Sequence, residues 1–117
     1  MMTESEEYRK LDYTHQKLME AVQFMATSAE PLERRLKGAM TAVKRLTGED
    51  FPSPALRDEW FTVIEPFTRE DALGDERKHY AIISKMSANE QGKTAESIFS
   101  LFYHVANERS DIREGVR

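Results

Sequence analysis

The chain has 117 residues, enough for one domain of ordinary size and too few for two. Charged residues make up 32% and apolar residues 39%, a globular composition that excludes a fibrous or wholly disordered chain. The net charge of −4 argues against a general nucleic-acid-binding protein. Because the sequence contains no cysteine, disulfides, thiolate metal sites and cysteine nucleophiles are excluded.

The first ten residues are polar and acidic, whereas a signal peptide begins with basic and then apolar residues. No apolar run approaches the roughly 20 residues that a membrane span requires. We therefore expect a cytoplasmic protein that does not enter a membrane.

Apolar residues recur at helical spacing along most of the chain and predict five helices. The first helix, residues 4–26, follows Thr3 as its N-cap residue. Its inward-facing seam is predicted to be Tyr8, Leu11, His15, Leu18, Val22 and Met25. The second helix, residues 31–47, begins at Pro31 and is predicted to end in a left-handed cap at Gly48.

The loop GEDFPSP precedes a third helix over residues 54–67, in which Ser53 is the N-cap residue and Pro54 the first helical residue. A fourth helix is expected over residues 75–86. Ser87 and Glu90 form a capping box that opens the fifth helix, residues 88–109. Short connections favour antiparallel neighbours, so the predicted fold is all-α: a single-domain, compact bundle of four to five mostly antiparallel helices.

Charge is distributed unevenly, and residues 48–76 carry a net charge of −7. Acidic residues around exposed aromatic rings can bind a basic groove, because charge speeds association and the rings add affinity. Since Trp60 and Phe61 are neighbours, a Trp60 side chain in the core would place Phe61 at the flank or surface of its helix. The predicted partner-binding residues are Glu49, Asp50, Phe51, Asp58, Glu59, Phe61 and Glu65.

The sequence has no G-x-S-x-G motif and no glycine-rich phosphate loop. We therefore predict a small non-enzymatic protein-interaction module, an inhibitor, adaptor or regulator that binds a larger protein. A small helical protein of this kind also resembles the products with which phages and mobile elements block host machinery. A homodimer is compatible with the seam of the first helix, where Tyr13 and Phe24 are further apolar residues.

An alternative function is nucleic-acid binding through the second helix, where residues 31–47 carry a net charge of +4. Its candidate phosphate-binding residues are Arg34, Arg35, Lys37, Lys44 and Arg45. The sequence offers no helix-turn-helix signature and no aromatic ladder to support this alternative. The same charges can equally form a solvated face that pairs with the acidic segments.

A weaker alternative is a metal-dependent helical-bundle enzyme, because Asp12–His15 and Glu76–His79 each place a carboxylate three residues before a histidine. Ferritin-like di-iron sites use such pairs together with further core glutamates, which this sequence does not offer. We therefore predict no metal and no cofactor. His15 is then expected to be a seam residue and a potential pH switch. His79 is expected at the surface, and His104 is expected to pair with Glu108 along one helix.

Overall fold

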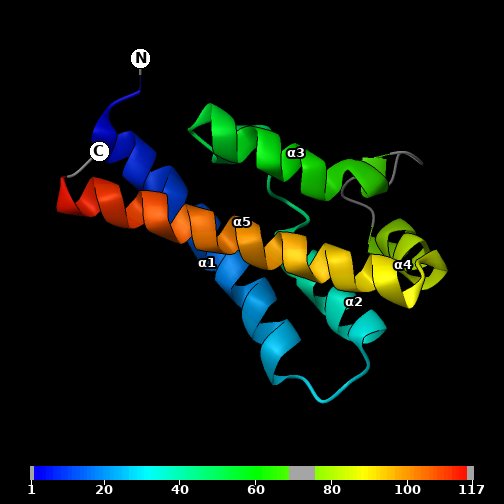
Figure 1. The fold of residues 1–117 in the computed structure, drawn as a ribbon. Coiled ribbons are helices and arrows are strands. Elements are labelled where there is room, and N and C mark those ends of the chain that lie inside the picture. The colour runs from blue at the N-terminus through cyan, green and yellow to red at the C-terminus, as the bar shows by residue number, and fades with distance from the viewer. Residues whose placement is uncertain (1, 69–75, 116–117) are drawn as a thin grey trace.

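The computed structural model describes residues 2–68 and 76–115, apart from the side chain of Glu76 (Figure 1). Its helices are α1 (Glu4–Thr27), α2 (Leu32–Val43), the 3-10 helix η1 (Gly48–Asp50), α3 (Pro54–Thr68), α4 (Glu76–Lys85) and α5 (Ala88–Glu114). The predicted all-α bundle is confirmed, and these residues contain no strand. Within the same ranges, no helix combines the length and the apolar composition needed to cross a bilayer.

The two longest helices, α1 and α5, pack against each other, and the start of α1 lies at the same end as the end of α5 (Figure 1). Helix α2 returns along α1 and also contacts α4 and α5. Helix α3 packs against α5, α4 and η1. The molecule measures 43 × 30 × 19 Å, and its short dimension corresponds to about two helix diameters.

Polar N-cap residues precede three of the helices, as the sequence predicts. The Thr3 hydroxyl accepts a hydrogen bond from the Glu6 amide at 3.2 Å, and Ser53 does the same for the Leu56 amide at 3.2 Å. The predicted capping box of α5 is present in both directions between Ser87 and Glu90. These hydrogen bonds satisfy amides that have no partner within the helix.

The end of α2 and the turn after it differ from the prediction. Helix α2 ends at Val43, four residues early, because the chain turns to bury Leu46. The predicted left-handed cap at Gly48 is wrong, since Gly48 starts η1 within a capping box formed by Thr47 and Asp50. The predicted first residue of the fourth helix, residue 75, lies outside the described residues.

Helix α5 is longer than the sequence indicates. Its predicted last residue is Arg109, whereas the helix continues to Glu114 and ends in a left-handed cap at Gly115, with φ 73°. The Arg109 guanidinium pairs with Asp12 of α1 at 2.7 Å, and Ile112 packs against the core. These contacts hold the last turns of α5 against α1.

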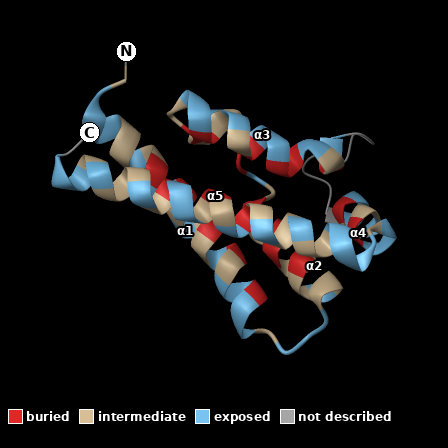
Figure 2. Ribbon diagram, in the orientation of Figure 1, coloured by how far each residue is buried: buried red, intermediate tan, exposed pale blue. Residues whose placement is uncertain are grey.

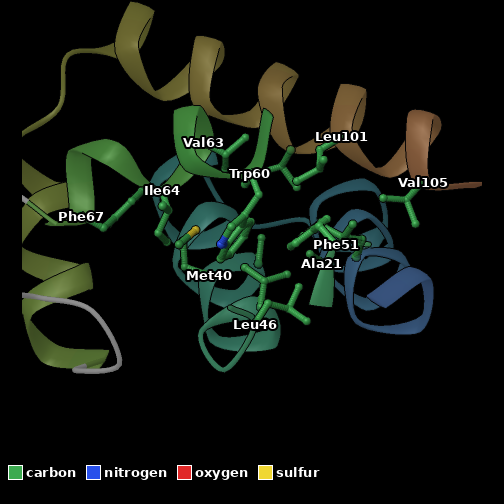
Figure 3. Close-up of a cluster of buried hydrophobic side chains, with 14 of the residues drawn as sticks. Ala21, Met40, Leu46, Phe51, Trp60, Val63, Ile64, Phe67, Leu101 and Val105 are labelled. Atoms are coloured by element: carbon green, nitrogen blue, oxygen red, sulfur yellow. The ribbon is translucent and has the colours of Figure 1, made fainter. Parts of the chain in front are cut away.

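The core lies between the helices, and the buried residues face one another across it (Figure 2). Phe51, which follows η1, stacks on Trp60 of α3 with ring centroids 5.2 Å apart and planes inclined by 20°. Both rings are buried, among side chains from α2 and α5 (Figure 3). The surrounding core residues include Met40, Leu46, Val63, Ile64, Phe67, Leu101 and Val105.

The buried face of α1 is rotated relative to the predicted seam. Thr14 and Ala21 are fully buried, whereas the predicted inward residues Tyr8, His15 and Val22 are only half-buried. The Thr14 hydroxyl donates to the Asp50 carbonyl at 2.6 Å, which ties α1 to η1. Sequence periodicity therefore identified the helix but misplaced the centre of its buried face by about one residue.

We expect Thr14→Val to lower the free energy of unfolding by about 1–3 kcal/mol, because it removes the hydrogen bond to a partly buried carbonyl. The matched control is Thr62→Val, since Thr62 is exposed and bonds within α3, to the Asp58 carbonyl. Urea unfolding of both variants measures the difference. Equal effects of the two substitutions would contradict a structural role for the Thr14 contact.

Candidate functional site

The most prominent surface feature of α3 is Phe61, which is 51% exposed between two carboxylates. Asp58, Phe61 and Glu65 are spaced i, i+3 and i+7, so they share one helix face, and all three are exposed. The opposite face of α3 is fixed in the core by Trp60 and Ile64. The burial of one face thus determines which side chains the other presents.

Phe61 lies over the start of η1. A Cβ atom at Gly48 would stand 2.8 Å from the end of the Phe61 ring, so the glycine permits this close approach. Arg57 Nε donates to the Gly48 carbonyl at 3.1 Å and holds η1 beside α3. Glu49, the residue after Gly48 in η1, is exposed. We call Glu49, Asp58, Phe61 and Glu65 the acidic face.

The prediction that Phe51 belongs to this surface is wrong, because its side chain is fully buried on Trp60. An aromatic residue in an otherwise polar loop can anchor that loop in the core, and Phe51 does so here. Its position between a glycine-containing acidic turn and two prolines was the available signal. The sequence alone could not distinguish this anchor from an exposed ring.

Asp50 and Glu59 hold other parts of the chain together, and Glu65 also has an interaction within the chain. Asp50 Oδ2 accepts a hydrogen bond from the Thr47 amide at 2.8 Å and so caps η1. Glu59 Oε1 lies 2.8 Å from His104 Nδ1, which joins α3 to α5. His104 therefore contacts a residue 45 positions away, where the sequence favoured a pair with Glu108.

Two open hollows flank Glu59 along the α3–α5 boundary, with volumes of about 380 and 530 Å³. Their lining includes four carboxylates and one lysine: Glu59, Glu96, Glu108, Asp111 and Lys93. The negative charge of α3 therefore continues across the boundary onto α5.

The basic residues of the second predicted helix do not form one free surface. Arg35 donates to the Glu30 and Met25 carbonyls at 2.9 and 3.1 Å, which fastens the α1–α2 connection. Lys37 pairs with Glu33 at 3.0 Å and lies over the Tyr80 ring. Arg34 and Arg45 are exposed, and Lys44 is half-buried.

The histidines of the two candidate metal motifs pack against different aromatic rings. His15 packs on Phe102, whereas His79 is buried against Phe67, which corrects the prediction that His79 lies at the surface. Among the side chains that the structure describes, no group of three or more His, Asp or Glu residues has the arrangement of a metal site. Glu76 of the second motif has a side chain outside that set.

His15 lies at the α1–α5 boundary beside charged neighbours. Partial burial lowers its pKa below the ordinary value, the Arg109 guanidinium lowers the pKa further, and the Asp12 carboxylate opposes the shift. The folded chain therefore disfavours protonation of His15.

No protein-family model, curated protein or solved structure matches this chain.

We expect the stability of the wild type to fall as the pH drops below about 6.5, the ordinary histidine pKa. Above that pH His15 is neutral in both states; below it the unfolded chain binds the proton more readily, which favours unfolding. His15→Gln should show a smaller loss when urea unfolding is compared at about pH 7.5 and about pH 5. His104→Gln, which retains His15, is the control, and identical pH profiles for wild type and His15→Gln would contradict the expectation.

Proposed function

We propose that this chain is a non-enzymatic protein-interaction module, an inhibitor, adaptor or regulator that binds a basic surface of a larger protein through its acidic face. The observation that carries the proposal is the half-exposed Phe61 ring between Asp58 and Glu65 on a helix fixed in the core. Aromatic side chains are enriched at the centres of protein interfaces, where desolvation of the ring contributes affinity.

The rigidity of α3 favours binding. Trp60, Ile64 and Phe67 hold the helix in the core, and Arg57 fastens η1 beside it. Phe61 is therefore presented without the ordering of a loop, which lowers the entropic cost of association.

The surrounding charge specifies the chemistry of the partner. Asp58 and Glu65 stand on either side of Phe61 along α3, and Glu49 follows the glycine that the ring covers. The carboxylates along the α3–α5 boundary extend the same sign of charge. A basic partner surface would be attracted over a distance set by the ionic strength. The association rate should accordingly fall as salt is added.

The alternative of nucleic-acid binding rests on Arg34 and Arg45, the exposed arginines of the second predicted helix. Arg35 and Lys37 already have partners within the chain, which leaves a narrower basic surface than the sequence indicated. Nucleic-acid binding is therefore the weaker candidate.

We expect Phe61→Ala to weaken capture of the partner from a nuclease-treated lysate by about tenfold or more, because it removes the central ring. The double variant Asp58→Lys, Glu65→Lys should lower the association rate and the salt dependence. Quantitative mass spectrometry of material retained on immobilised protein measures the first effect, and surface plasmon resonance with the captured partner measures the second.

Matched controls separate the acidic face from general effects. Tyr13→Ala removes an exposed ring from α1, and Glu20→Lys, Glu30→Lys makes the same change in net charge away from α3. Both should retain the partner. If Phe61→Ala retained as much partner as the wild type, the proposed surface would be contradicted. If the retained material were lost on nuclease treatment and in the double variant Arg34→Glu, Arg45→Glu, nucleic-acid binding would be favoured.

A further inference from the structure

The Phe61 ring of the acidic face meets η1 with its tip. A Cβ atom built on Gly48 would stand 2.8 Å from Cζ and 3.4 Å from Cε1 of the ring, so the glycine covers the far edge of Phe61. The side chain is nevertheless 51% exposed, and this exposed half therefore includes a flat side of the ring. Phe61 held in this way cannot enter a pocket of a partner tip first. It offers the partner a flat aromatic surface instead.

A flat aromatic surface attracts cations, because the face of the ring carries negative partial charge. Three tyrosine rings of this chain have a cation from the chain itself at 5.3 to 5.8 Å from the ring centre: Tyr8 with Arg109, Tyr80 with Lys37, and Tyr13 with Lys17. Among the residues that the structure describes, no Lys or Arg lies over Phe61 in this way. The face of the Phe61 ring is therefore accessible to a cation of a partner.

The only basic residue of α3, Arg57, is held beside η1. Its Nε donates to the Gly48 carbonyl at 3.1 Å, and its side chain is half-buried. The Arg57 guanidinium thus supports the backbone under the tip of the ring.

Two carboxylates of α3 stand beside the ring. Asp58 precedes Phe61 by three residues and Glu65 follows it by four, spacings at which side chains on one helix are neighbours. Within residues 2–68 and 76–115 the exposed Asp58 carboxylate has no ion pair, whereas Glu65 has an interaction within the chain. Asp58 is therefore the principal acidic group for a cation that lies on the ring.

Arginine suits this arrangement better than other side chains. Its guanidinium is planar and can lie flat on an aromatic ring while its N–H groups, which point outward in the same plane, reach a carboxylate at the side. The lysine ammonium is compact and strongly hydrated, and it has no plane that stacks on a ring. An apolar side chain would contact Phe61 but leave Asp58 without an opposite charge.

We propose that the acidic face recognises an arginine of its partner, which stacks on Phe61 and pairs with Asp58. This inference rests on the proposed function, because the arginine belongs to the basic surface that the acidic face binds. It adds the identity of the central side chain of that surface and the reason that an aromatic residue stands among the carboxylates.

Two labelled peptides of equal length and charge test the proposal, one of alternating Arg and Ser and the other of alternating Lys and Ser. Fluorescence anisotropy measures their dissociation constants with the purified chain. We expect the arginine peptide to bind about fivefold more tightly or better, because only the guanidinium stacks on the ring. Phe61→Leu retains an apolar side chain without a ring and should abolish this preference. Asp58→Asn should reduce it.

Tyr13→Leu is the matched control, because it removes an exposed ring on α1 and should leave the preference unchanged. Circular dichroism establishes that each variant is folded. The proposal is overturned if the wild type binds the two peptides equally or binds neither measurably. It is also overturned if the arginine preference survives in Phe61→Leu or is lost in Tyr13→Leu.

Capture of the partner by Phe61→Ala separates this proposal from the proposed function. If the partner is lost with Phe61→Ala while the wild type binds both peptides equally, the acidic face remains the docking surface and the arginine is overturned. If the arginine preference is present but Phe61→Ala still captures the partner, the arginine site stands and the proposed function fails.

Discussion

The stack of Phe51 on Trp60 is the contact on which the other features depend. It fastens the segment after η1 to α3, while Thr14 fastens η1 to α1 through the Asp50 carbonyl. Three segments far apart in the sequence thereby meet at one point of the core. Because successive residues of a helix point about 100° apart, the inward position of Trp60 turns Phe61 outward. The exposure of Phe61 is thus a consequence of the burial of Trp60.

The elements that could be predicted from the sequence are those with local causes. Ser53 and Ser87 cap helices through amides three residues away, so their neighbours in the sequence reveal them. The features that were missed depend on distant contacts. Phe51 needs Trp60 as its partner, and His104 finds Glu59 across 45 residues. The buried face of α1 was predicted only in part, because periodicity identifies the helix but locates its buried face only to within about one residue.

The sequence overstated the charge available on both candidate surfaces, because some of the charged residues have partners within the chain. Asp50 caps η1 and Glu59 joins α3 to α5, so these acids have structural roles. Arg35 likewise holds backbone carbonyls at the α1–α2 connection. The number of charges in a segment is therefore a poor measure of the charge that a surface can offer. The acidic face is smaller than the surface predicted from the sequence, and it is centred on Phe61.

The charge of the acidic face limits what can bind it. Two copies of this face repel each other, because Asp58 and Glu65 carry the same sign of charge, whereas a basic surface is attracted. The Phe61 ring would add affinity once charge has brought such a partner close, because the ring is already half-exposed on a helix fixed in the core. The association rate and the affinity therefore depend on different residues of one helix face.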